Sequence, residues 1–384
     1  MVNQPVPPPA IALAQALIAR ASVTPDDAGC QTLVAEQLAE AGFAIEWMPR
    51  GKVTNLLATR GQTGPVLLFV GHTDVVPPGP ADDWTSPPFE PTRRDGRLYG
   101  RGSADMKTSV AAFVTACLTL PASANLRLAI ALTSDEEGPA RDGIRAIAPV
   151  IDERLGGIDW CLVGEPSSRT QLGDTVRVGR RGSLSGAVTV NGRQGHVAYP
   201  DQADNALHRL LALMAELSNT HWDDGSGDFP PTRLQVTGID AATDAGNVIP
   251  GQASARFNLR YAPASTAESL QRRIRAIADR HAPAAAIDWD HSAAPFASEP
   301  GRLRQAINTV IARRRGQPPQ ANTAGGTSDG RFIAPLGAEV VEFGPVNETI
   351  HQADEHVALE AIDQLAADYA AIIQYLDEPD RTPD

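Results

Sequence analysis

Side chains that could bind a cation stand at the ends of apolar segments in this 384-residue chain. His72 and Asp74 closely follow the apolar run 66–70. Because they are two positions apart, both face the same side of an extended backbone. A histidine beside a carboxylate suits a metal ligand and the group that orients it. The pair alone fits a capped turn with a hydrogen-bonded histidine equally well.

Two neighbouring glutamates follow a second apolar run, 126–132. Adjacent residues of an extended chain point in opposite directions, so one of Glu136 and Glu137 could bind a metal while the other faces a substrate. A solvated acidic loop is the ordinary alternative. The end of an apolar strand is where α/β sheets place their binding sites, however, and this position favours a functional pair.

Three further segments each offer one ligand. Asp105 lies in a glycine-flanked turn, 100–107, where it could also be a simple helix N-cap. Glu165 again follows an apolar run, and a histidine precedes the last predicted helix. The whole set exceeds the four ligands of one tetrahedral zinc, and it fits two metals ~3.5–4 Å apart that share a bridging carboxylate. The candidate metal ligands are His72, Asp105, Glu137, Glu165 and His351.

A metal-independent hydrolase would need a nucleophile such as serine. Ser167 and Ser328 lie beside glycines, but neither stands in a G-x-S-x-G segment and neither has a histidine nearby in the sequence. The glycine turn 100–107 does not predict a phosphate loop either, because it lacks the GK[ST] ending. Metal-dependent chemistry is therefore favoured.

The segments between these residues predict an α/β domain with a largely parallel sheet. Apolar runs without clean alternation are typical of strands buried on both faces, and they occur at 43–47, 55–59, 66–70, 126–133 and 159–163. Helical patterns occur between and around them, at 10–22, 27–41, 106–120 and 141–151. Strands that alternate with helices in this way indicate a mostly parallel central sheet.

The pattern changes near residue 181. Apolar–polar alternation at 182–191, 234–239 and 254–261, with helical patterns at 205–219 and 266–281, predicts an α+β open sandwich. After residue 295 the α/β character returns, with helices at 301–315 and 358–376 and a strand at 339–343. We therefore expect one domain made of 1–181 and 295–384, into which a second domain, 182–294, is inserted.

Composition excludes several classes of protein. The chain carries 33 Lys plus Arg against 46 Asp plus Glu, a net charge of −13, which argues against a nucleic-acid partner. A hydrophobic content of 42% argues against general disorder. No apolar run is long enough for a membrane helix, and the first residues do not resemble a signal peptide. The three cysteines are far apart in the sequence, which suits a protein of a reducing compartment. We expect a cytoplasmic protein with no membrane partner.

In this order, the segments GHTDVVPPG, GRGSADMK, TSDEEG and GEPS resemble the dizinc aminoacylase/carboxypeptidase family over nearly the whole chain. The resemblance implies a dizinc-peptidase catalytic domain and an inserted lid and dimerisation domain. It implies two zinc ions per subunit, with cobalt able to replace zinc at one site, held by the five candidate ligands with Asp105 bridging. It also implies that Glu136 is the general base and that Asp74 orients His72.

Within that family, segments 180–183, 326–332 and 343–351 resemble the branch that hydrolyses N-succinyl-LL-2,6-diaminopimelate to succinate and LL-diaminopimelate. Acetylornithine deacetylases and other N-acyl amino acid amidohydrolases are the nearest alternatives, and a non-catalytic binding relative is the alternative of another class. One departure is Asp354, where the resemblance leads us to expect asparagine before Glu355.

The resemblance also implies a homodimer, in which His196 of the inserted domain reaches across to help stabilise the oxyanion in the partner's site. The substrate would be a small molecule, and an arginine suits its carboxylate through two parallel hydrogen bonds. The candidate substrate contacts are Arg180, Ser183, Tyr199, Asn247, Arg260, Thr327 and Asn347.

Overall fold

The structure, a computed structural model, describes residues 9–378 except 242 and 244. The chain forms two compact units. Unit 1 contains the chain up to Gly179, Ala297–Asn322 and the chain from Ser328 onward, and unit 2 contains Arg180–Phe296 and Thr323–Thr327. Unit 2 therefore includes a five-residue segment that lies outside the predicted insertion 182–294. The role of unit 2 as a lid or dimerisation domain stays a prediction.

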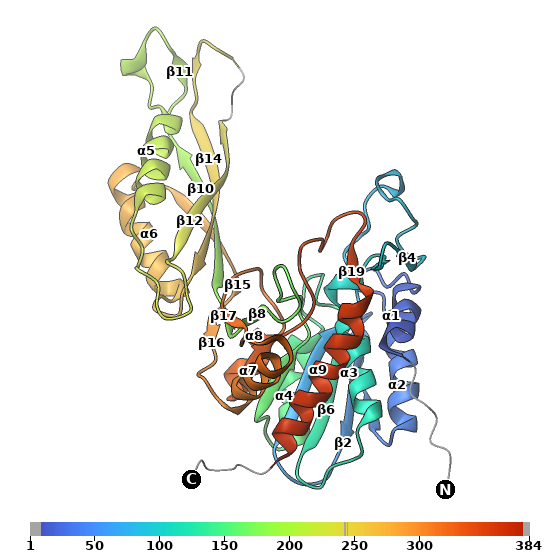
Figure 1. Cartoon of the computed structure of the whole chain (residues 1–384). Coiled ribbons are helices and arrows are strands. Elements are labelled where there is room, and N and C mark those ends of the chain that lie inside the picture. The colour runs from blue at the N-terminus through green and yellow to red at the C-terminus, as the bar shows by residue number, and fades with distance from the viewer. Residues whose placement is uncertain (1–8, 242, 244, 379–384) are drawn as a thin grey trace, which may run out of the picture. The chain divides into compact units, whose positions relative to one another are not determined.

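Unit 1 is built on an eight-stranded sheet in the order β1-β2-β6-β3-β7-β18-β8-β17 (Figure 1). Strand β3 runs parallel to both β6 and β7, and β18 runs parallel to β7, whereas β1 and β2 are antiparallel additions at one edge. The predicted α/β class with a mostly parallel central sheet is confirmed. The strands are β1 (Ala44–Trp47), β2 (Asn55–Arg60), β3 (Val66–His72), β6 (Arg127–Thr133), β7 (Trp160–Val163), β8 (Thr175–Arg177), β17 (Gln320–Asn322) and β18 (Glu339–Glu342).

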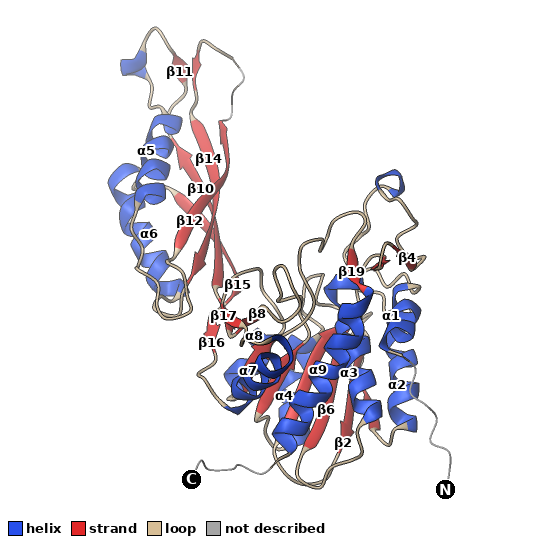
Figure 2. Cartoon of the chain, in the orientation of Figure 1, coloured by secondary structure: helices blue, strands red, loops and turns tan. Residues whose placement is uncertain are grey.

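Helices cover this sheet because its central strands are apolar on both faces. Leu67 and Phe69 of β3 join one large core with the helices α1, α2, α3, α7 and α9, while Leu68 and Val70, which point the opposite way, are equally buried. Figure 2 shows α3 and α9 lying across one face of the sheet. The helices are α1 (Ala10–Ile18), α2 (Cys30–Glu40), α3 (Thr108–Thr119), α4 (Ile144–Leu155), α7 (Arg302–Arg315), α8 (Gly330–Ile333) and α9 (Leu359–Asp377).

The parallel strands end at one edge of the sheet, which is where the candidate ligands follow. In register, His72 pairs with Thr133 at the ends of β3 and β6, and Val70 pairs with Val163 at the end of β7. The loops that leave these three strands therefore start side by side. A small sheet of β4 (Thr92–Arg94), β5 (Arg97–Tyr99) and β19 (His356–Ala358) was not predicted, because its three-residue strands carry no readable alternation.

Unit 2 is an antiparallel sheet in the order β12-β14-β10-β15 with two helices packed on it. Strand β15 was missed, although Ile287 and Trp289 alternate with aspartates and could have revealed it. The elements are β10 (Gly182–Asn191), β11 (Gly195–His196), α5 (Ala206–Asn219), β12 (Arg233–Ala241), β13 (Val248–Ile249), β14 (Gln252–Tyr261), α6 (Ala267–His281) and β15 (Ala286–Ala293), with β9 (Gly179–Arg180) and β16 (Phe296–Ala297) at the chain crossings. No helix within the described residues is long and apolar enough to cross a membrane.

Candidate metal centre

The Asp105 carboxylate lies between two imidazoles. Its Oδ1 is 3.1 Å from Nε2 of His72, and its Oδ2 is 3.5 Å from Nε2 of His351. Asp105 is buried at the start of the segment that leads into α3, and it makes no helix-capping hydrogen bond there. Each of its oxygens thus faces a different histidine, which is the arrangement that a carboxylate shared by two cations requires.

Two glutamates extend this cluster in opposite directions. Glu137 Oε1 is 3.0 Å from Nε2 of His351, and Glu165 Oε1 is 3.9 Å from Nε2 of His72. The structure therefore brings all five candidate ligands of unit 1 together, from the ends of β3, β6 and β7, from the turn before α3 and from the loop before β19. His72, Asp105, Glu137 and Glu165 are nearly enclosed, whereas the His351 side chain is 49% exposed, so the cluster is open to solvent on that side.

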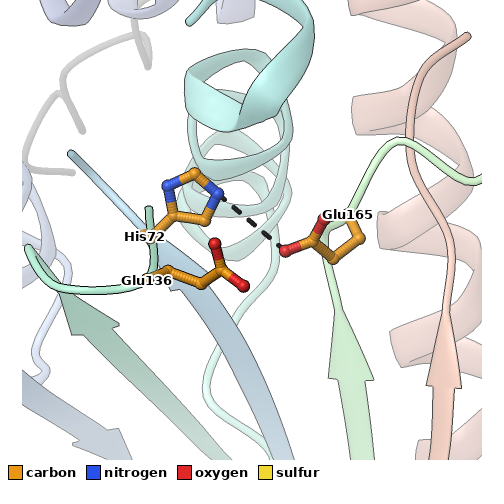
Figure 3. A group of neighbouring side chains, drawn as sticks. All are labelled: His72, Glu136 and Glu165. Atoms are coloured by element: carbon orange, nitrogen blue, oxygen red, sulfur yellow. Dashed lines mark ion pairs between the residues drawn. The ribbon is translucent and has the colours of Figure 1, made fainter. Parts of the chain in front are cut away.

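Glu136 points into the same cluster. Figure 3 shows Glu136, Glu165 and His72 directed toward one another, and donor atoms of all three lie within 4.8 Å of each other. A second group with the same spacing joins His72 to Asp105 and Glu137. Geometry alone therefore allows Glu136 to act either as a metal ligand or as a base beside the metals.

The main chain and the side chain of Asp74 make different contacts. Its backbone carbonyl lies 2.8 Å from Nδ1 of His72, so this nitrogen carries a proton, and in the neutral form of the ring Nε2 is the nitrogen that can bind a cation. The Asp74 carboxylate lies 3.7 Å from the same ring nitrogen and accepts the backbone N–H groups of Glu136 (3.3 Å) and Glu137 (3.1 Å). Asp74 therefore orients both His72 and the pair of glutamates.

Hydrogen bonding between the histidines and carboxylates shifts their pKa values. Burial opposes charge on His72, but its hydrogen bond to Asp105 and the charge of that carboxylate raise the His72 pKa well above its usual value. Burial also opposes ionisation of Asp105, yet hydrogen bonds from His351 and His72 hold its pKa well below the usual range. Hydrogen bonds to Asp105 and Glu137 raise the pKa of His351 to about 10.

The remaining carboxylates are crowded. Burial raises the pKa of Glu136 well above its usual value, and the nearby charge of Asp329 adds to this effect. Burial and then the charge of Asp105 do the same to Glu165. Several carboxylates in a buried space favour bound positive charge, and in this cluster protons on the histidines supply it. Neutral imidazoles and ionised carboxylates are also the donor set that divalent zinc prefers, so the residues present fit two such cations.

Neither candidate serine has the partners of a nucleophile. The Ser167 hydroxyl donates to the Thr175 carbonyl at 3.0 Å, and the Ser328 hydroxyl donates to the Glu342 carboxylate. Both side chains are fully buried. Among the hydrogen bonds of the described residues, neither hydroxyl contacts a histidine, so the serine alternative has no support.

The candidate lid histidine belongs to unit 2, where one of its ring nitrogens accepts a backbone hydrogen bond. His196 is exposed, and its Nδ1 accepts the backbone N–H of Ala198 at 3.1 Å. In the neutral ring the proton then lies on Nε2. The ring of Tyr199, 62% exposed, lies 5.8 Å from the His196 ring, and the Asn247 carbonyl accepts the Val197 N–H at 3.1 Å.

The other candidate substrate contacts form local groups. Arg180 donates to the carbonyls of Ala324 (3.1 Å) and Gly326 (3.3 Å), and so holds the turn that precedes Thr327. Ser183 and Arg260 are direct partners across β10 and β14. Six of the seven candidates therefore lie in unit 2, and only Asn347 lies in unit 1, where its backbone N–H donates to the Ser168 carbonyl at 3.0 Å.

Sequence reasoning missed the carboxylates that shape the loops around the cluster. Asp135 accepts three backbone N–H groups of the loop after the glutamates, those of Ala140 (3.2 Å), Arg141 (2.8 Å) and Asp142 (2.9 Å). An aspartate a few residues before a loop commonly bonds backbone groups in this way, and that pattern was a usable signal. Glu355 holds the turn before α3 in a comparable way, because it accepts the backbone N–H groups of Gly102, Ala104 and Asp105.

Comparison with known proteins places this chain in a family of peptidases. The sequence pattern of Peptidase family M20/M25/M40 matches residues 68–375. The chain is 54% identical over 371 residues to a succinyl-diaminopimelate desuccinylase of Halorhodospira halophila, covering 96% of this chain and 98% of the relative. It is 55% identical over 363 residues to a protein of the same name in Xanthomonas oryzae pv. oryzae, covering 94% and 96%.

Solved structures share the fold at low sequence identity. A metallo-carboxypeptidase of the M20 family from Sulfolobus solfataricus superposes with a TM-score of 0.77 at 14% identity, covering 96% of this chain and 99% of that one. A dinuclear metal-binding peptidase from Bacillus subtilis superposes with a TM-score of 0.69 at 18% identity, covering 95% and 97%. Both likenesses extend over nearly the whole of each chain.

Proposed function

This chain belongs to Peptidase family M20/M25/M40, and from that premise we propose that it is a metal-dependent amidohydrolase that cleaves N-succinyl-LL-2,6-diaminopimelate to succinate and LL-diaminopimelate, a step of lysine biosynthesis. The substrate is supported by relatives of that name at 54–55% identity. The reaction type is supported by one observation above the others: the Asp105 carboxylate divides its two oxygens between two histidines.

Two zinc ions per subunit are the proposed cofactor, with cobalt able to replace zinc at one site. We assign them to the five candidate ligands, with Asp105 shared. When bound, two such cations would polarise the amide carbonyl and make an attacking water more acidic. The exposed side of the cluster, at His351, is where a substrate would approach.

The protein's own groups would move the protons and place the substrate. Glu136, held by its backbone N–H on Asp74, would take the proton from the attacking water and pass it to the leaving nitrogen. His196 would donate its Nε2–H to the oxygen that becomes negative as water attacks. The seven candidate contacts named above would bind the substrate carboxylates and amines.

We also propose a homodimer in which His196 of one subunit serves the site of the other, and a cytoplasmic location. The location is supported by three free, buried cysteines, Cys30, Cys117 and Cys161, which suit a reducing compartment. The dimer can be tested by mixing two inactive variants, His196→Ala and Glu136→Gln. Mixed dimers would contain one site with an intact Glu136 and an intact partner histidine, so some activity should return. No recovery after verified subunit exchange would refute the role across subunits.

The substrate is tested by a direct comparison. The zinc-loaded chain is offered N-succinyl-LL-2,6-diaminopimelate and, separately, N-acetylornithine, and kcat/KM is measured for both. The proposal expects a much higher value for the succinyl compound. A preference for acetylornithine would make the chain a deacetylase, and turnover of neither would leave it as a binding protein of the same fold.

A further inference from the structure

Glu355 lies four residues after His351 and is almost fully enclosed, at 1% exposure. Its carboxylate receives four donors, all from the turn that ends at Asp105. Oε2 accepts Arg101 Nη1 at 2.7 Å and the Gly102 N–H at 2.9 Å. Oε1 accepts the Ala104 N–H at 2.8 Å and the Asp105 N–H at 3.1 Å. Glu355 is not among the candidate catalytic residues, metal ligands or substrate contacts.

These contacts join the two loops that face each other across the metal centre. Besides the carboxylate contacts, the Glu355 carbonyl accepts the Gly100 N–H at 3.0 Å, and Arg101 Nη1 also donates to the Gln352 carbonyl at 3.1 Å. The loop that carries His351 is thereby fastened to the turn that carries Asp105. His351 has a φ of +61°, a conformation that a residue other than glycine keeps only when surrounding contacts hold it, whereas Gly102 supplies a left-handed position of the turn, with φ of +81°, without strain.

We propose that Glu355 is a positioning residue of the metal centre: its carboxylate holds the 101–105 turn in shape and sets the distance between Asp105 and His351 before any cation binds. This inference rests on the proposed function, because it concerns the site where the cations would bind. The neighbouring Asp354 can replace the expected asparagine for a reason of its own. Asp354 also adopts a positive φ, which asparagine and aspartate both tolerate, and its carboxylate accepts the Thr85 N–H at 2.9 Å.

A carboxylate is needed at position 355 because each of its two oxygens accepts two hydrogen bonds. In a Glu355→Gln variant the side chain keeps one oxygen and gains an NH₂ group. Whichever way the amide is turned, this NH₂ faces two N–H donors, either those of Arg101 and Gly102 or those of Ala104 and Asp105. Two hydrogen bonds are lost and replaced by repulsion, so the turn must change its shape at Asp105.

The chain offers a matched control in Glu339 at the start of β18. This carboxylate also holds a loop by its backbone, because it accepts the N–H groups of Gly301 (3.0 Å), Leu303 (2.8 Å) and Arg304 (2.9 Å) at the start of α7. None of these residues belongs to the metal cluster. Glu339→Gln therefore reproduces the loss of backbone hydrogen bonds without touching the Asp105 turn.

The first experiment needs no variant. Amide hydrogen exchange of the metal-free wild-type chain should show protection at Gly102, Ala104 and Asp105, because Glu355 already holds these N–H groups. Adding zinc should change their exchange little. Exchange at the rate of an unfolded chain in the metal-free state, with protection only after zinc is added, would overturn the proposal.

The second experiment is a zinc titration of the metal-free wild type, Glu355→Gln and Glu339→Gln, each checked for folding by urea unfolding. Loss of a group that orients a ligand typically costs ~10–100-fold in metal affinity, and we expect a loss of this size for Glu355→Gln only. Should Glu355→Gln not fold, Glu355→Asp, whose shorter side chain cannot reach all four donors, is measured in the same way. Wild-type affinity in a folded Glu355 variant, or an equal loss in Glu339→Gln, would overturn the inference. A wild-type chain that binds no zinc would instead overturn the proposed metal centre on which the inference rests.

Discussion

The neighbouring glutamates allow a sharp prediction, because the structure permits two roles for Glu136. Its carboxylate shares a space of 4.8 Å with donor atoms of His72 and Glu165, so it could be a ligand. In our account it is the base, and Glu137 is the ligand. The Glu136→Gln variant separates the two roles, because an amide of the same shape cannot accept a proton. The main chain should stay in place, because the Asp74 carboxylate accepts the Glu136 N–H and this hydrogen bond does not involve the Glu136 side chain.

The expected size of the effect follows from the role. Loss of a general base typically costs ~10²–10⁴-fold in rate. This range corresponds to a rise of about 2.7–5.5 kcal/mol in the activation free energy. A lost ligand would instead reduce metal content. We therefore expect Glu136→Gln to keep two zinc ions and wild-type stability while kcat falls by that factor, and Glu137→Gln to lose metal.

The assay follows loss of the succinyl amide in the far ultraviolet, with zinc measured by elemental analysis on the same sample. A Glu136→Gln chain that turns over at close to the wild-type rate would refute the base assignment. A Glu136→Gln chain that retains less than its full zinc, beside a Glu137→Gln chain that retains all of it, would show that the two glutamates have exchanged roles.

Two further predictions concern positions away from the reacting atoms. Burial raises the pKa of Asp174, but hydrogen bonds from three backbone N–H groups and a threonine hydroxyl outweigh it and lower this pKa to about 2. The ionised Asp174 therefore stabilises the folded state fully above its unfolded pKa, near 4, and this stabilisation is lost as pH falls through about 2. With a discount for solvent exposure, Asp174→Asn should lower the free energy of unfolding by about 1 kcal/mol at pH 7. Urea unfolding should show that the difference between wild type and variant shrinks below pH 4. A difference that stays constant with pH would contradict the lowered pKa of Asp174. Gly164→Ala would place a Cβ 2.5 Å from Met106 Cε and 2.7 Å from Phe69 Cζ, so neighbouring atoms must shift at a cost of about 1–3 kcal/mol in stability. Zinc binding should also weaken, because the candidate ligand Glu165 is the next residue. Unchanged zinc affinity would show that this shift does not reach Glu165.

The sequence was most informative where chemistry and periodicity agreed. The apolar runs that became β3, β6 and β7 predicted the parallel sheet, and the rule that binding groups follow such strands predicted the region of His72, Glu137 and Glu165. Spacing could not show that Asp105 and His351 join them, because both lie on loops whose paths depend on contacts distant in sequence. Their place in the candidate set came from residue type and from family resemblance.

Glu355 shows why other features of the site could not be predicted from the sequence. A glutamate in a polar segment normally predicts a solvated side chain, and its partners lie some 250 positions earlier in the chain. Only the folded chain reveals that four donors converge on it. Likewise, the sequence suggested that the Asp74 carboxylate orients His72, but the backbone carbonyl of Asp74 makes the closer contact, and backbone groups carry no signature in the sequence.

The most direct test of the central claim is a zinc titration of the metal-free wild-type chain in which bound zinc and hydrolysis of N-succinyl-LL-2,6-diaminopimelate are measured on the same samples. Our account predicts no turnover without metal, turnover that returns as zinc binds, and binding that ends at two equivalents per chain. Undiminished hydrolysis by the metal-free chain, or zinc binding that ends at one equivalent, would contradict a centre in which Asp105 is shared by two cations.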